Sequence, residues 1–205
     1  MALTNETIKQ RLVEKFGEQV SNFEEPYGML NFEASKEMNL KVMQFLFDEP
    51  GLQFQFLADL CAVHYPDNLG RELAVVYHLH SLRENVRVRF KVFTSIQQAD
   101  IFTATRLFSS ANWMERETYD FFGVNFLGHP NMKRILNVDE MDYFPMRKEF
   151  PLEEQTRVDK DDEMFGRGGS IDFGNMQAPD HHHTIAEEDK KREQEILSNG
   201  NGNVQ

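Results

Sequence analysis

The sequence has little cysteine and no long apolar run. Cys61 is the only cysteine among 205 residues. A disulfide framework within the chain, a four-cysteine zinc site and an iron–sulfur cluster each need several sulfur ligands, so one cysteine excludes all three. The longest unbroken apolar run, 73–77, has five residues, whereas a membrane-spanning helix needs about 18 or more. These absences predict a soluble chain suited to a reducing compartment.

Basic side chains are also few compared with acidic ones. The chain has 22 Lys and Arg against 34 Asp and Glu, which gives a net charge of −12. A field of this sign repels phosphate, so we expect no non-specific binding to nucleic acid or to an anionic membrane. The N-terminal segment has neither an apolar signal core nor the Arg-rich character of a transit peptide. We therefore expect the protein to stay in the compartment where it is made.

The charge is unevenly spread along the chain. Residues 1–150 hold 21 acidic and 16 basic side chains, which leaves −7 of the net charge in 151–205. That last stretch contains GRGG, HHH and SNGNGN, with few residues able to form a core. Ordering each residue costs about 1–2 kcal/mol of backbone entropy, which such a segment cannot recover alone. We predict a domain over 1–151 and an acidic, low-complexity tail over 152–205, disordered or extended on a partner.

Apolar spacing within 1–151 changes from helical to strand-like. Residues three and four apart predict a first helix from Thr4 or Asn5 to before Gly17, and a second over 35–48. Period-two alternation and turn residues predict strands at 18–24, 28–33, 52–56, 73–79 and 86–92. Helices first and an antiparallel sheet later are typical of an α+β fold, a two-layer domain with helices packed on a mostly antiparallel sheet.

Two polar patterns on the predicted strands leave alternatives open. His78 and His80 share one face of a strand, as two metal ligands would, although a solvated surface pair is commoner. Arg87, Arg89 and Lys91 form a basic stripe on one face, which is either a solvated surface or a contact with an acidic neighbour.

Glycine and histidine in the predicted tail also suggest ligand sites. The glycines at 166–169 precede IDFG rather than a helix, so no nucleotide site is predicted. The run His181–His183 could bind a divalent metal weakly, yet histidines also occur in low-complexity tails without such a role. We predict no metal site in this chain.

The stretch 113–123, WMERETYDFFG, predicts a helix closed by Gly123, with Ser110 or Asn112 as its cap. Arg116 and Asp120 are four residues apart and are therefore expected to pair. An exposed ion pair beside a core stripe explains this pattern adequately.

Trp113 lies among the charges of this predicted helix, an arrangement that favours a protein interface. Glu115, Glu117 and Asp120 could act as a general acid/base set if burial raised one carboxyl pKa. Because Arg116 lies among them, we expect it to lower their pKa values instead. No catalytic residue is predicted.

The same stretch, with the residues after it, resembles a known family. The matching positions are Glu115, Arg116, Glu117, Asp120, Phe121, Phe122, His129, Lys133, Ile135 and Leu136. They resemble the signature of the C subunit of proton-pumping NADH:quinone oxidoreductase, respiratory complex I, and the resemblance covers roughly residues 5–152. The family more often has His-Pro-Leu-Arg-Lys where this chain has Phe-Pro-Met-Arg-Lys at 144–148.

The resemblance implies a structural, accessory component of the hydrophilic arm, with no active site and no cofactor of its own. FMN, iron–sulfur clusters and quinone would belong to the assembled complex, which transfers electrons from NADH to quinone and translocates protons. The implied partners are chiefly the D subunit, which holds the quinone site, and also the B and I subunits. The implied location is peripheral, on the cytoplasmic face of the bacterial inner membrane. The signature residues would then form an interface between subunits.

A second docking element is expected after the signature. Pro145 and Pro151 keep the residues between them extended, so that Arg147 and Lys148 project beside the aromatics. Together with Trp113, these two basic residues are our candidate docking residues.

Two alternatives to this function stay open. One is the equivalent subunit of a related membrane-bound hydrogenase or of a complex fed by ferredoxin. The signature cannot separate these complexes, because a subunit of this kind contacts no electron donor. The other is an independent metal-binding or acid/base protein, which would be a monomer with bound metal or turnover of its own.

Overall fold

The computed structural model describes residues 3–150 of the chain. The predicted tail, with His181–His183, lies outside the described residues. In chain order the elements are α1 (Asn5–Phe16), β1 (Val20–Glu24), β2 (Leu30–Ala34), α2 (Asn39–Asp48), β3 (Phe56–His64), β4 (Leu73–Ser81), β5 (Val86–Thr94), β6 (Asp100–Phe102), α3 (Ala111–Phe122) and β7 (Asn125–Leu127). No helix in this part of the chain is both long enough and apolar enough to cross a membrane.

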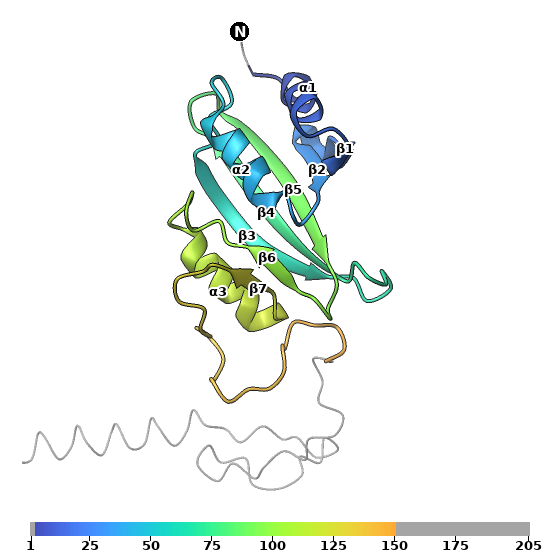
Figure 1. The fold of residues 1–205 in the computed structure, drawn as a ribbon, viewed down its shortest axis with the longest axis vertical. Helices are drawn as coiled ribbons and strands as arrows, with labels where there is room; N and C mark the ends of the chain where they lie inside the picture. The colour runs from blue at the N-terminus through green and yellow to red at the C-terminus, as the bar shows by residue number, and fades with distance from the viewer. Residues whose placement is uncertain (1–2, 151–205) are drawn as a thin grey trace, which may run out of the picture. The chain divides into compact units, whose positions relative to one another are not determined.

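Five strands form one sheet in the order β1-β2-β5-β4-β3 (Figure 1). Neighbouring strands are antiparallel except β2 and β5, which are parallel. The short strands β6 and β7 form a separate parallel pair. Helix α2 lies across the sheet, and α3 packs beside the edge strand β3 (Figure 1). The predicted α+β fold with helices on a mostly antiparallel sheet is confirmed.

The core lies between α1, α2 and one face of the sheet. Alternate residues of the strands point into it, so Phe32, Tyr77 and Phe90 are almost fully buried. Their rings stack across neighbouring strands, with centroid distances of 5.3 Å for Phe32–Phe90 and 4.7 Å for Tyr77–Phe90. Aromatic pairs of this kind contribute roughly 0.5–1.5 kcal/mol beyond the area that they bury. They fix the register of the central strands.

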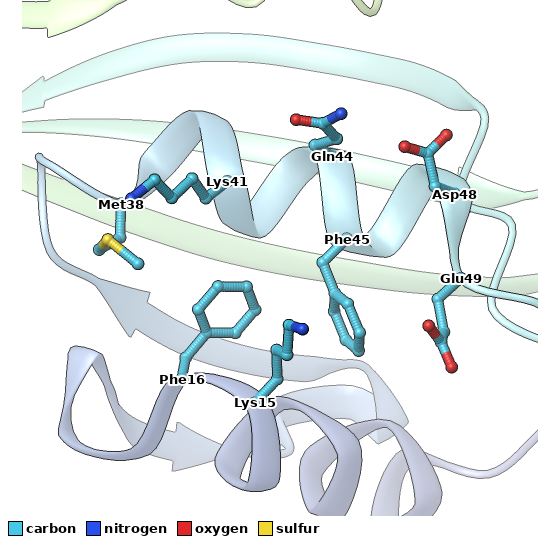
Figure 2. A pocket seen from close by; sticks show the side chains of 8 residues that line it. All are labelled: Lys15, Phe16, Met38, Lys41, Gln44, Phe45, Asp48 and Glu49. Atoms are coloured by element: carbon cyan, nitrogen blue, oxygen red, sulfur yellow. The ribbon is translucent and has the colours of Figure 1, made fainter.

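A shallow cavity of about 440 Å³ lies between α1 and α2. Figure 2 shows Phe16 and Phe45 facing one another across it, and their rings meet edge to face with centroids 5.5 Å apart. Lysine and carboxylate side chains of both helices line the rest. Because its polar groups carry both signs and form no convergent set, this cavity is not our candidate site.

Strands 73–79 and 86–92, the hairpin between them and the first helix are found as expected. The strand predicted at 52–56 is wrong. Leu52 and Phe54 are fully buried, but in a loop, where the Phe54 amide donates to the Leu46 carbonyl at 2.9 Å. The strand begins only at Phe56. The alternating apolar residues therefore belong to a loop that lies on the core. The second helix, α2, begins at Asn39, four residues later than expected.

Candidate functional site on helix α3

Helix α3 and its glycine stop are as predicted. Gly123 ends the helix with φ 76°, a left-handed conformation, and its amide donates to the Tyr119 carbonyl at 2.8 Å. A Cβ at this position would lie 2.5 Å from Cε2 of Phe144, so a side chain has no room either. Ser110 is the N-cap residue, one of the two predicted, but it does not cap the helix through its side chain.

Glu115 is fully buried on the inner side of α3. Its Oε2 accepts a hydrogen bond from Oγ1 of Thr103, and its Oε1 accepts one from the amide of Ala104, both at 2.6 Å. Burial raises the pKa of Glu115 from 4.5 to about 7, although these two hydrogen bonds act in the opposite direction. The expected lowering by Arg116 is therefore wrong for this carboxyl group. Both of its oxygens are hydrogen-bonded within the fold and the side chain is fully buried, so it does not face a substrate.

Asp120 is the anchor of the segment that follows the helix. Its Oδ1 accepts from Nη1 of Arg134 at 2.8 Å and from the Asn137 side chain at 3.0 Å. Its Oδ2 accepts from three consecutive amides, those of Ile135, Leu136 and Asn137, at 2.8 to 3.0 Å. Burial alone would raise the pKa of Asp120, but these hydrogen bonds hold it well below its usual range. The carboxylate stays ionised and fixes four consecutive residues, 134–137, at once.

Arg116 does not pair with Asp120, so that prediction is wrong. Its Nε donates to the backbone carbonyl of Lys133 at 3.1 Å, and its guanidinium lies 4.8 Å from the ring centroid of Trp113. Helical spacing permits the pair, but the Asp120 carboxylate is already taken by Arg134. Arg116 thus holds the same downstream segment from the outer side of α3.

His129 forms part of a turn, as expected from Pro130 after it. Its Nδ1 accepts from the amide of Asn131 at 3.0 Å, so its Nε2 carries the proton and donates to the Asn112 carbonyl at 3.1 Å. Both ring nitrogens are therefore engaged within the chain. The residue joins the start of α3 to the turn and is not free for catalysis.

The segment 143–150 also lies against α3. The Met146 amide donates to the Phe121 carbonyl at 3.1 Å, and Nε of Arg147 donates to the Phe122 carbonyl at 2.7 Å. Arg147, expected to project outward, has only 12% of its side chain exposed. Lys148 remains exposed, while its amide donates to Nδ1 of His64 at 3.0 Å. We call residues 129–150 the wrapping segment, because the bonds above tie it to α3.

Several large apolar side chains remain on the outer surface of α3 and the wrapping segment. Trp113 is 61% exposed, Leu136 64% and Val138 63%. Phe121, Phe122 and Ile135 are half-buried, and Glu117 and Lys133 are exposed. The structure therefore divides the signature into residues bonded within the fold, such as Glu115 and Asp120, and residues that face outward, such as Glu117 and Leu136.

Sequence reasoning missed three residues that build the site: Thr103, Arg134 and Asn137. Each meets a carboxylate of α3 from a distant loop, so no helical or strand period relates the partners. A buried carboxylate needs donors, which is the one signal that could have prompted a search for them.

The two strand histidines share one face, as expected. Nδ1 of His78 lies 3.5 Å from Oδ2 of Asp59, and Nε2 of His80 lies 3.3 Å from Oδ1 of Asn85. Between residues 3 and 150 no group of three or more His, Cys, Asp or Glu is placed to hold a metal ion.

Comparison with known proteins gives a consistent result. The model of the family described as respiratory-chain NADH dehydrogenase, 30 kDa subunit, matches residues 32–156. A curated relative from Azorhizobium caulinodans, named as the C subunit of NADH-quinone oxidoreductase, is 40% identical over 138 residues. That alignment covers 67% of this chain and 64% of the relative, so the chain spans less than two thirds of the relative's length.

Two solved structures share the fold. One is described as Nqo5 of the trypsin-resistant fragment (1–134); it is 30% identical, with a TM-score of 0.53, over 60% of this chain and 98% of that one. The other, described as the membrane-bound sulfane sulfur reductase, an archaeal respiratory membrane complex, is 22% identical with a TM-score of 0.60. It covers 72% of this chain and 85% of that one, and at this identity it shows the fold alone.

Proposed function

The chain belongs to the family of the respiratory-chain NADH dehydrogenase 30 kDa subunit, and from that membership we propose that it is the C subunit of an NADH:quinone oxidoreductase. In this proposal it is a structural component of the hydrophilic arm, packed against the D subunit and supporting the B and I subunits. Its work is to hold these neighbours in place.

One observation carries this proposal beyond the family match. Two of the three carboxylates of α3, those of Glu115 and Asp120, are satisfied inside the chain, whereas Trp113, Leu136 and Val138 face outward on α3 and the wrapping segment. Tryptophan is among the residues most enriched at interface hot spots, and the exposed Leu136 and Val138 add apolar area that a partner could bury. Burying each against a partner would contribute about 1.5–3 kcal/mol.

The redox chemistry would then belong to the assembled complex. FMN, iron–sulfur clusters and quinone would be held by other subunits, and this chain would bind none of them. It would lie peripherally, at the cytoplasmic face of the bacterial inner membrane, through its contacts with the complex. The residues that we propose for docking are the exposed signature positions Glu117, Lys133 and Leu136, together with Trp113 and Lys148. The buried signature residues Glu115 and Asp120 would act inside the fold. Arg147 would contribute by fixing the wrapping segment.

Purification under native conditions tests the proposal. The tagged full chain should recover subunits of the oxidoreductase, identified by mass spectrometry, together with NADH:quinone reductase activity. Trp113→Ala should lower both while the circular dichroism of the free chain stays unchanged, because the ring is largely exposed. Tyr27→Ala is the matched control, since Tyr27 is a fully exposed aromatic residue in a turn between β1 and β2. If the Trp113→Ala chain recovered the other subunits and the reductase activity at wild-type levels, the outward face of α3 would no longer support the proposed function.

The same purification separates the alternative. The equivalent subunit of a hydrogenase or of a ferredoxin-fed complex would be recovered without the flavin- and NADH-binding subunits. The similarity at 40% identity to a protein named as the C subunit of NADH-quinone oxidoreductase favours the first assignment. Recovery of a monomer with bound metal or turnover of its own would contradict both.

A further inference from the structure

A charged face of the sheet lies on the side opposite the core. On β5, the buried residues Val88, Phe90 and Val92 point toward α1 and α2, so Arg87, Arg89 and Lys91 point the other way. We define these three residues as the basic stripe. We propose that the basic stripe binds an acidic segment of a neighbouring subunit in the same complex; this inference rests on the proposed function.

The register places each member of the basic stripe beside a polar residue on at least one neighbouring strand, although Lys91 faces the apolar Val76 on β4. Arg87 lies opposite His80 and Arg89 opposite His78 on β4, while Lys91 lies beside Glu33 on β2. This face of the sheet is therefore polar around Arg87 and Arg89, whereas from Lys91 onward the apolar residues Val76 and Ala74 of β4 and Phe93 of β5 share it. Arg87 is the most exposed member of the stripe.

The acidic groups on this face do not neutralise the stripe. Glu33 makes its ion pair with Arg71, and Asp59 lies 3.5 Å from His78. Arg89 donates from Nε to the neutral Oδ1 of Asn31 at 2.6 Å. Across residues 3–150, no member of the stripe forms an ion pair. Three positive charges thus remain uncompensated on a chain whose net charge is −12.

The geometry and the net charge identify the kind of partner. Same-face residues on a strand are about 6.6–6.8 Å apart, which matches alternate side chains of a second extended segment. Carboxylates at alternate positions of such a segment could meet Arg87, Arg89 and Lys91 in turn. The chain as a whole, with its net charge of −12, repels every negatively charged partner. It repels a membrane surface or a nucleic acid more than a short acidic segment, because each carries many more negative charges.

Charge reversal of the two freer members tests the inference. In the full chain expressed from its own locus, Arg87→Glu with Lys91→Glu should reduce recovery of the other subunits roughly tenfold, because like charges across an interface oppose association. Recovery with the unaltered chain should also fall as salt is raised. Arg89 is left in place because of its bond to Asn31.

Two exposed lysines on the helical side of the molecule supply the matched control. Lys15→Glu with Lys41→Glu changes the net charge by the same amount and lies at the cavity between α1 and α2 (Figure 2). Unchanged circular dichroism and melting temperature for both double variants establish that each is folded. Recovery reduced equally by both would indicate a net-charge effect and would overturn the inference.

A photo-crosslinking residue in place of Arg87 identifies the occupant in the intact complex. We expect cross-links to a peptide of another subunit that is rich in Asp and Glu. Cross-links to residues 151–205 of this chain or to lipid would overturn the assignment, as would equal recovery with and without charge reversal. If the unaltered chain recovers no oxidoreductase subunit, the proposed function fails; if it does and charge reversal has no effect, only this inference fails.

Discussion

Protonation of Glu115 should make the stability of this protein depend on pH near neutrality. The pKa of its buried carboxyl is about 7 in the folded chain and 4.5 in its ordinary state. A group whose pKa is raised by folding binds its proton more tightly when folded. Its contribution is therefore fully present below about pH 4.5 and is lost as the pH rises to about 7.

The size of the effect follows from the two pKa values. Their difference corresponds to roughly 3 kcal/mol of unfolding free energy lost between pH 4.5 and pH 7.5. Glu115→Gln keeps a side chain of the same shape that is neutral at every pH. Its carbonyl oxygen can accept from the Ala104 amide, and its amino group can donate to the Thr103 hydroxyl. The variant should therefore gain about 3 kcal/mol relative to wild type over that pH range.

Urea unfolding of the full chain, followed by circular dichroism at several pH values from 4.5 to 7.5, measures this gain. Glu117→Gln is the control, because Glu117 lies two residues further along the same helix and is exposed. We expect the free-energy difference between Glu115→Gln and wild type to rise steadily with pH. A flat difference for Glu115→Gln would refute the reasoning from burial.

Two further changes test how the wrapping segment is held. Asp120→Asn should cost about 3 kcal/mol of unfolding free energy, because it leaves Arg134 buried without a counter-charge. Since folding lowers the pKa of Asp120, wild type should lose this stability below about pH 4, and acid titration of both chains measures the loss. Gly123→Ala should cost at least about 1 kcal/mol of unfolding free energy, because the added methyl group would collide with the Phe144 ring. In thermal melting this variant should be less stable than the control Gly17→Ala, because Gly17 also has a positive φ but has open space around it.

The sequence predicted what local periodicity controls. The sequence of the hairpin strands alternates apolar and polar residues over most of its length, and α3 ends at a glycine that adopts the left-handed conformation, so both were found at the expected places. The first five residues of β4 are all buried, which the alternation did not predict. The loop holding Leu52 and Phe54 alternates in the same way without being a strand, and only its position over the core reveals this. Long-range partners follow no period. Asp120 has Arg116 within helical reach, yet its counter-ion is Arg134, fourteen residues away.

Substitutions of the inward-facing and outward-facing residues of α3 should therefore have different effects on the protease resistance of the free chain. Asp120 fixes the amides of the wrapping segment, so Asp120→Asn should open that segment to proteolysis in the free chain and also reduce assembly. Trp113 makes its described contact with Arg116 at the surface, so Trp113→Ala should reduce assembly while the free chain stays resistant to protease. Limited proteolysis and recovery of the other subunits, measured on the same two variants, separate these roles. If both variants lost protease resistance equally, Trp113 would be a fold residue and its proposed docking role would be wrong.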